Sequence, residues 1–192
     1  MAAPRVKPAT YDDLLALPDD VVGEIVDGEL VAMPRPRPRH SAAARRGSAT
    51  LDGYDGASGG GGSRRDGPGG WILLIEPEVR WGTEVAVPDL AGWRRDRLPR
   101  LPDTASVEIP PDWVMEIISP RTARHDRGAK RRMYARWGVE WLWFVDPDAR
   151  VVETLQLRDG EYVLKGTWGD DELMVAEPFP LAEVPLAYWW GD

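Results

Sequence analysis

The chain contains no cysteine, and only two of its 192 residues are histidines, His40 and His125. The absence of cysteine excludes disulfide bonds and gives no sign of an oxidising compartment. So few cysteine and histidine side chains also argue against a structural zinc site, which normally takes four of them.

Long hydrophobic runs are missing too. No apolar run approaches the roughly 20 residues that a membrane helix requires, and the first eight residues, MAAPRVKP, lack the apolar core of a signal peptide. Hydrophobic residues make up 43% and charged residues 29%, a balance typical of soluble globular proteins. We therefore expect one cytoplasmic domain over residues 1–192, with no membrane contact.

Charge is distributed unevenly, although the net charge is -8. Residues 35–136 hold 19 Lys and Arg against 13 Asp and Glu, whereas the remaining residues hold 5 against 19. A basic middle with acidic ends favours a surface that faces phosphates. The alternative is a solvated surface in which arginine is simply abundant, and charge alone does not separate the two.

Local signals predict an alternation of helices and strands. Thr10 caps a short helix that ends near Pro18, and Asp27-Gly28 joins two apolar runs into an N-terminal β-hairpin. Further helices are expected at 40–54, which is alanine-rich and weak, and at 126–137, with Asp126 as its N-cap and Gly138 as its stop. Further strands are expected at 71–81, 84–93, 112–119, 140–145, 150–157 and 162–168.

Two segments are expected to lack regular structure. Residues 34–39 alternate proline with arginine, which predicts an extended loop. Residues 56–70 are glycine-rich and are not followed by Gly-Lys-Ser/Thr, which predicts a flexible linker instead of a phosphate-binding loop. The whole pattern predicts one α/β (α+β) domain with a mixed central sheet and a core over about residues 11–165.

Glu116 lies in the middle of residues 112–119, where both faces of the predicted strand are apolar. A buried carboxylate needs a cation, a partner or a proton. Asp89 is a second acid in an apolar run, and Pro88 before it predicts a bulge or a strand edge that aims the side chain. A structural ion pair for Glu116 and an ordinary Pro-Asp turn for Asp89 are the alternatives.

Lys130 shares one helical stripe with Met133, Tyr134 and Trp137, so it is expected to point toward the core. The alternative is a lysine that snorkels at the edge of the core. Two carboxylates beside a lysine suggest a hard divalent cation, with Mg²⁺ expected first and Mn²⁺ second, because oxygen ligands select these ions over zinc. Such a site performs hydrolytic phosphodiester chemistry.

Several motifs occur in the order found in a known family. They are EIVDGEL at 24–30, PRH at 38–40, VPD at 87–89, VMEIISP at 114–120, and DRGAK at 126–130 followed by Tyr134. Over roughly residues 11–162 the chain resembles the Uma-type putative restriction endonucleases of the PD-(D/E)xK nuclease superfamily. The resemblance implies a restriction-endonuclease-like fold, in which a mixed sheet is flanked by helices.

The resemblance also implies roles for individual residues. Asp89 and Glu116 would be the two metal-binding acids, with the backbone carbonyl of Ile117 as a further ligand. The superfamily usually has lysine two residues after the second acid, where Ile118 stands here, so Lys130 would be its substitute. Four residues would have supporting roles: Glu24, His40, Asp126 and Tyr134. The alanine-rich helix after His40 and the long glycine-rich segment depart from the family pattern.

Three functions are compatible with these features. The first is a magnesium-dependent DNA endonuclease, a hydrolase in which arginines grip the DNA backbone: Arg94, Arg95, Arg97, Arg121, Arg124, Arg127 and Arg131. The second is a catalytically silent nuclease-fold module that binds nucleic acid or protein. The third is an interaction protein with a surface of Trp141, Trp143, Trp189 and Trp190, for which core packing is the alternative. A homodimer would suit the first, because two cuts in a duplex call for two sites.

Overall fold

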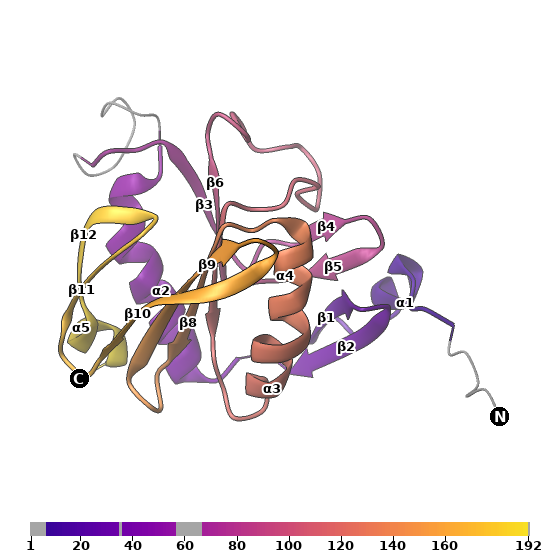
Figure 1. The fold of residues 1–192 in the computed structure, drawn as a ribbon. Helices are drawn as coiled ribbons and strands as arrows, with labels where there is room; N and C mark the ends of the chain where they lie inside the picture. The colour runs from indigo at the N-terminus through magenta and orange to yellow at the C-terminus, as the bar shows by residue number, and fades with distance from the viewer. Residues whose placement is uncertain (1–6, 35, 57–66, 192) are drawn as a thin grey trace.

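The computed structural model describes residues 7–34, 36–56 and 67–191. A six-stranded mixed sheet forms its centre, in the order β10-β9-β8-β7-β6-β3, and only β7 and β8 are parallel neighbours (Figure 1). Its strands are β3 (Trp71–Ile75), β6 (Leu90–Arg94), β7 (Trp113–Ile117), β8 (Trp141–Asp146), β9 (Val151–Arg158) and β10 (Glu161–Gly169). The expected mixed central sheet is confirmed.

A smaller antiparallel sheet lies beside the large one, in the order β2-β1-β5-β4. Its strands are β1 (Val21–Val26), β2 (Glu29–Pro34), β4 (Val79–Trp81) and β5 (Glu84–Ala86). The predicted N-terminal hairpin is confirmed, and its turn residues Asp27 and Gly28 have φ values of 54° and 77°. Two positive φ values suit a tight hairpin turn, which Gly adopts freely and Asp tolerates.

The prediction of single strands over 71–81 and 84–93 was wrong. Each run is two strands, because the chain leaves the large sheet after β3, forms the β4–β5 hairpin of the small sheet, and returns as β6. Both crossings contain a proline, Pro77 or Pro88, which cannot donate a hydrogen bond to a continuing ladder. Asp89 therefore comes at the point where the chain re-enters the large sheet.

The first two helices agree with the prediction. Thr10 and Asp13 form a reciprocal capping box at α1 (Tyr11–Leu15). The weak alanine-rich helix is α2 (Pro38–Leu51), followed by the short 3-10 turn η1 (Asp52–Tyr54). Helix α2 begins inside the segment expected to be an extended loop, since proline is tolerated in the first turn of a helix.

The third helical segment is longer and less regular than predicted. It consists of α3 (Ala123–His125), the π-helical turn η2 (Asp126–Lys130) and α4 (Arg131–Trp137). Asp126 is not an N-cap, because the helix begins three residues earlier and Asp126 is buried within it. Gly138 ends α4 in the left-handed conformation, as predicted. π-Helical turns are rare and often lie at functional sites.

The two faces of the large sheet carry separate cores. On one face, Trp113 and Met115 pack with α2, β11 (Leu173–Ala176), β12 (Phe179–Pro185) and α5 (Leu186–Trp190). On the other, Val114 and Ile118 pack with α4 and the small sheet (Figure 1). The alternation expected along residues 112–119 is thus confirmed. Glu116 shares the second face, because side chains along a strand alternate.

The four tryptophans considered for an interaction surface belong to the core or pack against it. Trp141, Trp143 and Trp189 are buried, and Trp190 is partly buried against the same cluster. The core therefore includes residues beyond 165.

None of the helices in the described ranges is long and apolar enough to cross a membrane. The centre of the predicted glycine-rich linker, residues 57–66, lies outside the described residues.

Candidate active site

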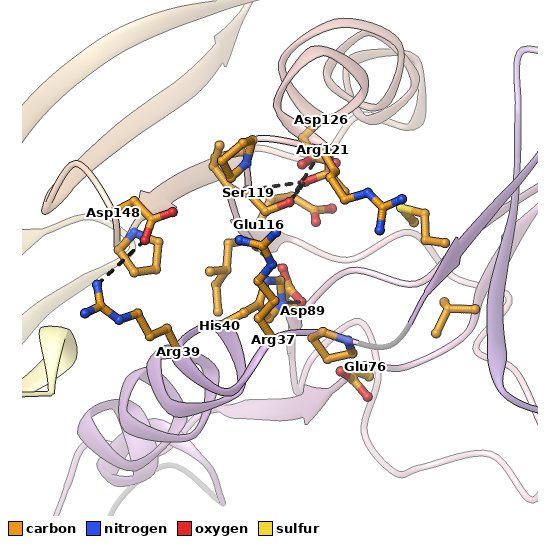
Figure 2. Close-up of a pocket in the computed structure, with 18 of the residues that line it drawn as sticks. Arg37, Arg39, His40, Glu76, Asp89, Glu116, Ser119, Arg121, Asp126 and Asp148 are labelled. Atoms are coloured by element: carbon orange, nitrogen blue, oxygen red, sulfur yellow. Dashed lines mark hydrogen bonds and ion pairs between the residues drawn. The ribbon is translucent and has the colours of Figure 1, made fainter.

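The candidate site lies at one edge of the large sheet, the edge that is formed by strand ends and not by an outer strand. Strand β7 ends there and β6 begins there, and the pairing of Leu90 with Met115 brings Asp89 opposite Glu116. A cavity of about 420 Å³ opens at this edge (Figure 2). It is lined by Val22, Met33, Pro36, Arg37, Pro38, Arg39, His40, Glu76, Val87, Asp89, Glu116, Ile117, Ile118, Ser119, Pro120, Arg121, Thr122, Asp126, Lys130, Pro147 and Asp148.

Lys130 lies at the floor of this cavity, where its side chain is 2% exposed. Its ammonium Nζ is 2.8 Å from Glu24 Oε1 on the small sheet and 2.8 Å from Glu116 Oε1 on the large sheet. The Tyr134 hydroxyl, one turn along the helix, donates to the same Glu116 oxygen at 2.5 Å. The stripe predicted for Lys130, Met133, Tyr134 and Trp137 is buried throughout. The lysine thus joins the two sheets.

Asp89 is held by contacts at both carboxylate oxygens. Its Oδ1 is 2.5 Å from His40 Nε2 in the first turn of α2, and its Oδ2 accepts the backbone N–H of Ile117 at 2.6 Å. The Asp89 side chain is 13% exposed and that of His40 is 18% exposed. Asp89 therefore lies nearer the opening of the cavity than Glu116, in a fixed orientation.

Glu24 and Asp126 complete the acidic cluster. Glu24 Oε1 also accepts the backbone N–H of Val87 at 2.8 Å. Its other oxygen, Oε2, lies 3.5 Å from His125 Nε2, and both of these buried atoms lack a well-formed hydrogen bond. Asp126 is 3% exposed and lines the same cavity.

Burial and neighbouring acids both act on the pKa values of this cluster. Burial raises the pKa of Glu116 well above its usual range, and the neighbouring acids Asp126 and Asp89 add to the shift, against the opposing effect of Lys130. Burial also raises the pKa of Asp126. Burial lowers the pKa of Lys130, but Glu116 and Glu24 outweigh this and hold it well above normal. The lysine therefore stays charged.

Two further pKa values follow from close contacts. For Glu24, burial favours the neutral form, but Lys130 and His125 outweigh it and lower the pKa. For His40, burial favours the neutral ring, but the hydrogen bond and charge of Asp89 raise the pKa. These contacts favour the ionised form of Glu24 beside the lysine and the cationic form of His40 beside Asp89.

The residues present suit a divalent cation with oxygen ligands. Four buried or nearly buried carboxylates (Glu24, Asp89, Glu116 and Asp126) surround one lysine, so one more cation would reduce their repulsion. Among the described residues no three Asp, Glu, His or Cys side chains lie close enough to hold a metal by themselves. Asp89 and Glu116 would therefore act with the backbone oxygen of Ile117 and with water, a ligand set that Mg²⁺ accepts.

The predicted DNA-contacting arginines are not brought together. Arg94, Arg95 and Arg97 lie at the opposite edge of the sheet, five or more residues along β6 from Asp89, which is roughly 16 Å at the usual rise per residue. They bind within the protein there: Arg94 to Glu140 at 3.3 Å, Arg95 to the Gly56 carbonyl at 2.7 Å and Arg97 to Asp112 at 2.7 Å.

The arginines of the later segment differ among themselves. Arg121 is exposed and lines the cavity, whereas Arg124 is exposed outside it. Arg127 pairs with Glu153, and Arg131 donates to the Tyr162 carbonyl at 3.0 Å. Only Arg121 of the seven therefore contributes to the cavity.

Sequence reasoning missed three residues that the fold brings to the site. Arg37, at the N-terminus of α2, and Glu76, directly after β3, line the opening of the cavity, and His125 faces Glu24. Glu76 had a usable signal, because it is an acid beside a proline at the end of an apolar run, as Asp89 is. Arg37 and His125 had none, since their positions depend on how the helices pack.

Comparisons with known proteins bear on the fold and the family of the chain. The chain is similar to the crystal structure of a putative nuclease of the DUF820 family from Anabaena variabilis, with a TM-score of 0.73 and 21% identity over 95% of this chain and 98% of that one. At this identity the likeness shows the fold. No curated protein matches the chain. The profile of the Uma2 family, described as putative restriction endonuclease, matches residues 8–187, and the chain therefore belongs to the Uma2 family.

Proposed function

We propose that the protein is a metal-dependent DNA endonuclease that hydrolyses phosphodiester bonds. One observation carries the proposal: Asp89, Glu116 and Lys130 come from three separate elements and meet in one cavity, with the lysine held between two carboxylates. A purely structural ion pair would need one carboxylate for the lysine, whereas this cluster has four acids. Membership of a family of putative restriction endonucleases supports the same reading.

Asp89, Glu116 and the carbonyl of Ile117 would hold the cation, Mg²⁺ in the first place and Mn²⁺ as an alternative. Each carboxylate oxygen of Asp89 has one protein partner, which leaves lone pairs for a metal. A divalent cation bound there would polarise water and offset the charge of the phosphate.

Lys130 supplies a fixed positive charge at the floor of the cavity. Two of its ammonium protons point to Glu24 and Glu116, and the third remains for the attacking water or a phosphate oxygen. Glu24 keeps the ammonium in place, because its own carboxylate is also tied to the backbone of β5–β6 through the Val87 N–H. Tyr134 orients Glu116 through its hydroxyl. Such preorganised charge is what stabilises a phosphoryl transition state.

His40 stands between the cavity opening and Asp89. Its ring keeps Asp89 oriented, and its raised pKa favours the cationic form that attracts a phosphate. During hydrolysis one P–O bond breaks, the water oxygen binds phosphorus, and its proton passes to the leaving oxygen.

Nicking of supercoiled plasmid tests the proposal. Wild type is incubated with Mg²⁺, with Mn²⁺ and with a chelator, beside Asp89→Asn, Glu116→Gln and Glu140→Gln. Glu140 is the matched control, because it is a paired glutamate at the opposite edge of the same sheet. Nicking that needs metal, is lost in the first two variants and persists in the control supports the proposal.

Two other outcomes would count against it. Nicking that survives in Asp89→Asn and Glu116→Gln would place the activity elsewhere or in a contaminant. Salt-sensitive DNA binding without nicking by any protein would favour the catalytically silent module. Sedimentation of the same samples with DNA would test the homodimer expected for a double-strand cut.

A further inference from the structure

The cavity has an exposed rim and a buried floor. Arg37, Pro120 and Arg121 at the rim are exposed, whereas Glu116 and Lys130 at the floor are only 4% and 2% exposed. A phosphodiester must therefore enter the cavity to reach the floor. Figure 2 shows Arg37, Asp89 and Arg121 gathered near Glu116, and Arg39 turned toward Asp148.

The cavity has the size of a small-molecule pocket. Its volume of about 420 Å³ is near the lower end of the range for pockets that enclose a single ligand, roughly 300–1,000 Å³. The major groove of duplex DNA alone is ~12 Å wide. This volume is of the order of one nucleotide, whereas a continuous duplex would meet the cavity only at its rim.

The walls match the chemistry of one unstacked nucleotide. Four of the lining residues are prolines and several others are aliphatic, which gives apolar surface for a base. Three rim arginines, Arg37, Arg39 and Arg121, offer charge for flanking phosphates, although Arg39 also pairs with Asp148 at 3.8 Å.

The surface around the cavity offers little for a long duplex. The arginines on the solvent side of η2 and α4 already pair with acids: Arg127 with Glu153, Arg132 with Asp27, and Arg136 with Asp27 and Glu84. Duplex binding depends on many cations that are available to phosphates. Among the described residues near the site, Arg37 and Arg121 line the cavity rim, and Arg124 is exposed outside it.

We propose that the cavity accepts one unpaired nucleotide, so that the preferred substrate is single-stranded or locally unpaired DNA and not continuous duplex. The proposal rests on the proposed nuclease function. A base that is already unpaired enters such a pocket without the unpairing and unstacking that a paired base requires. Single strands, bulges and the opened regions of supercoiled plasmid would then be cut in preference to relaxed duplex.

Cleavage of one labelled oligonucleotide in three forms tests the proposal: single-stranded, fully paired, and paired around a one-nucleotide bulge. The expected result with Mn²⁺ or Mg²⁺ is that the first and third are cut at least about tenfold faster than the second. Full duplex cut as fast as single strand would overturn the substrate preference while leaving the nuclease function standing.

Binding measured by fluorescence anisotropy separates the two proposals if no form is cut. Single-strand binding at least tenfold tighter than duplex binding, and weakened several-fold by Arg37→Ala with Arg121→Ala, supports the cavity assignment. Arg45→Ala is the control, because Arg45 is exposed on the same helix as Arg37 but does not line the cavity. Arg37 makes no side-chain capping bond, so its loss leaves α2 intact. Equal or tighter duplex binding, or no binding, overturns the assignment.

Discussion

The two edges of the large sheet use charge in opposite ways. At the edge where β6 ends, acids and bases are matched: buried Asp112 accepts the backbone N–H of Arg94 at 2.8 Å and the side chain of Arg97 at 2.7 Å, and Arg94 reaches Glu140. At the edge where β6 begins, four clustered acids share Lys130, with His40 beside Asp89 and His125 facing Glu24. Matched ion pairs stabilise the fold by themselves, whereas a cluster with more acids than bases needs a bound cation or protons from solvent.

Burial alone does not identify a functional acid. Asp112 and Glu116 belong to the same strand segment and are similarly buried, at 6% and 3%. They differ in what surrounds them. Asp112 has one donor on each oxygen, whereas a single oxygen of Glu116 takes both the Tyr134 hydroxyl and the ammonium that it shares with Glu24. Perturbed pKa values gather at the second kind of site.

The largest expected effect separates the two edges by activity. Glu116→Gln should lower plasmid nicking by about 10²–10³-fold, because it replaces a carboxylate oxygen that would hold the cation in the proposed function. Asp112→Asn makes the same kind of change at the other edge and should leave the rate, per folded molecule, within a few fold. Equal losses in the two variants would mean that the unmatched cluster has no special role.

Moving the ammonium group from the helix at Lys130 to the strand at Ile118 tests whether the charge alone is enough for activity. Lys130→Met should lower nicking by about 10²-fold. Ile118 lies on the same face of the strand as Glu116 and lines the cavity, so adding Ile118→Lys to Lys130→Met returns an ammonium to the site from the strand. Recovery of about tenfold would support the idea that the charge matters more than its origin. A double variant no better than the single one, although folded by circular dichroism, would contradict it.

Stability should change in opposite directions at the two edges. Asp112→Asn places an amide N–H₂ against a donor and should destabilise the fold by about 1–3 kcal/mol. Asp126→Asn should stabilise it at neutral pH, because burial raises the pKa of Asp126 in the folded state, so that its ionised form is unfavourable above that pKa. Urea unfolding at neutral pH measures both, and a stability loss in Asp126→Asn would refute the charge imbalance.

The smallest expected effect comes from Tyr134, a neutral side chain beside the acidic cluster. Tyr134→Phe removes one hydrogen bond to Glu116 and should lower activity only several-fold, with a stability change of about 1 kcal/mol. Tyr162→Phe is its counterpart outside the cluster, since that hydroxyl donates to the Val139 carbonyl at 2.7 Å. Steady-state nicking rates of the two variants should differ, and an identical effect would make Tyr134 merely structural.

Much of the fold could be predicted because its signals are local. The Asp27-Gly28 turn, the Thr10 cap and the alternation around Glu116 each depend on a few neighbouring residues. The crossings at Pro77 and Pro88 could not be predicted as changes of sheet, because proline marks an interruption and not the destination of the chain. The π-helical turn at Asp126 was likewise invisible to a pattern based on 3.6 residues per turn.

The burial of the acids and the lysine of the candidate site could also be predicted from local patterns. The positions of the arginines expected to contact DNA could not. Buried Glu116 and inward-pointing Lys130 follow from periodicity, and the fold brings them to 2.8 Å. Arg94 and Arg97 are near Asp89 in sequence, but an extended strand carries them to the far edge. Which arginine faces a ligand is decided by tertiary packing, which the sequence does not display.

The lysine that joins the two sheets also has a consequence for biosynthesis. Glu24, Asp89, Glu116 and Lys130 emerge from the ribosome far apart in time, and the ammonium reaches both of its carboxylates only after the small sheet has docked on the large one. A nascent chain that ends before Lys130, or a folding intermediate with undocked sheets, has an incomplete cluster. Any hydrolytic activity therefore requires that the two sheets have docked.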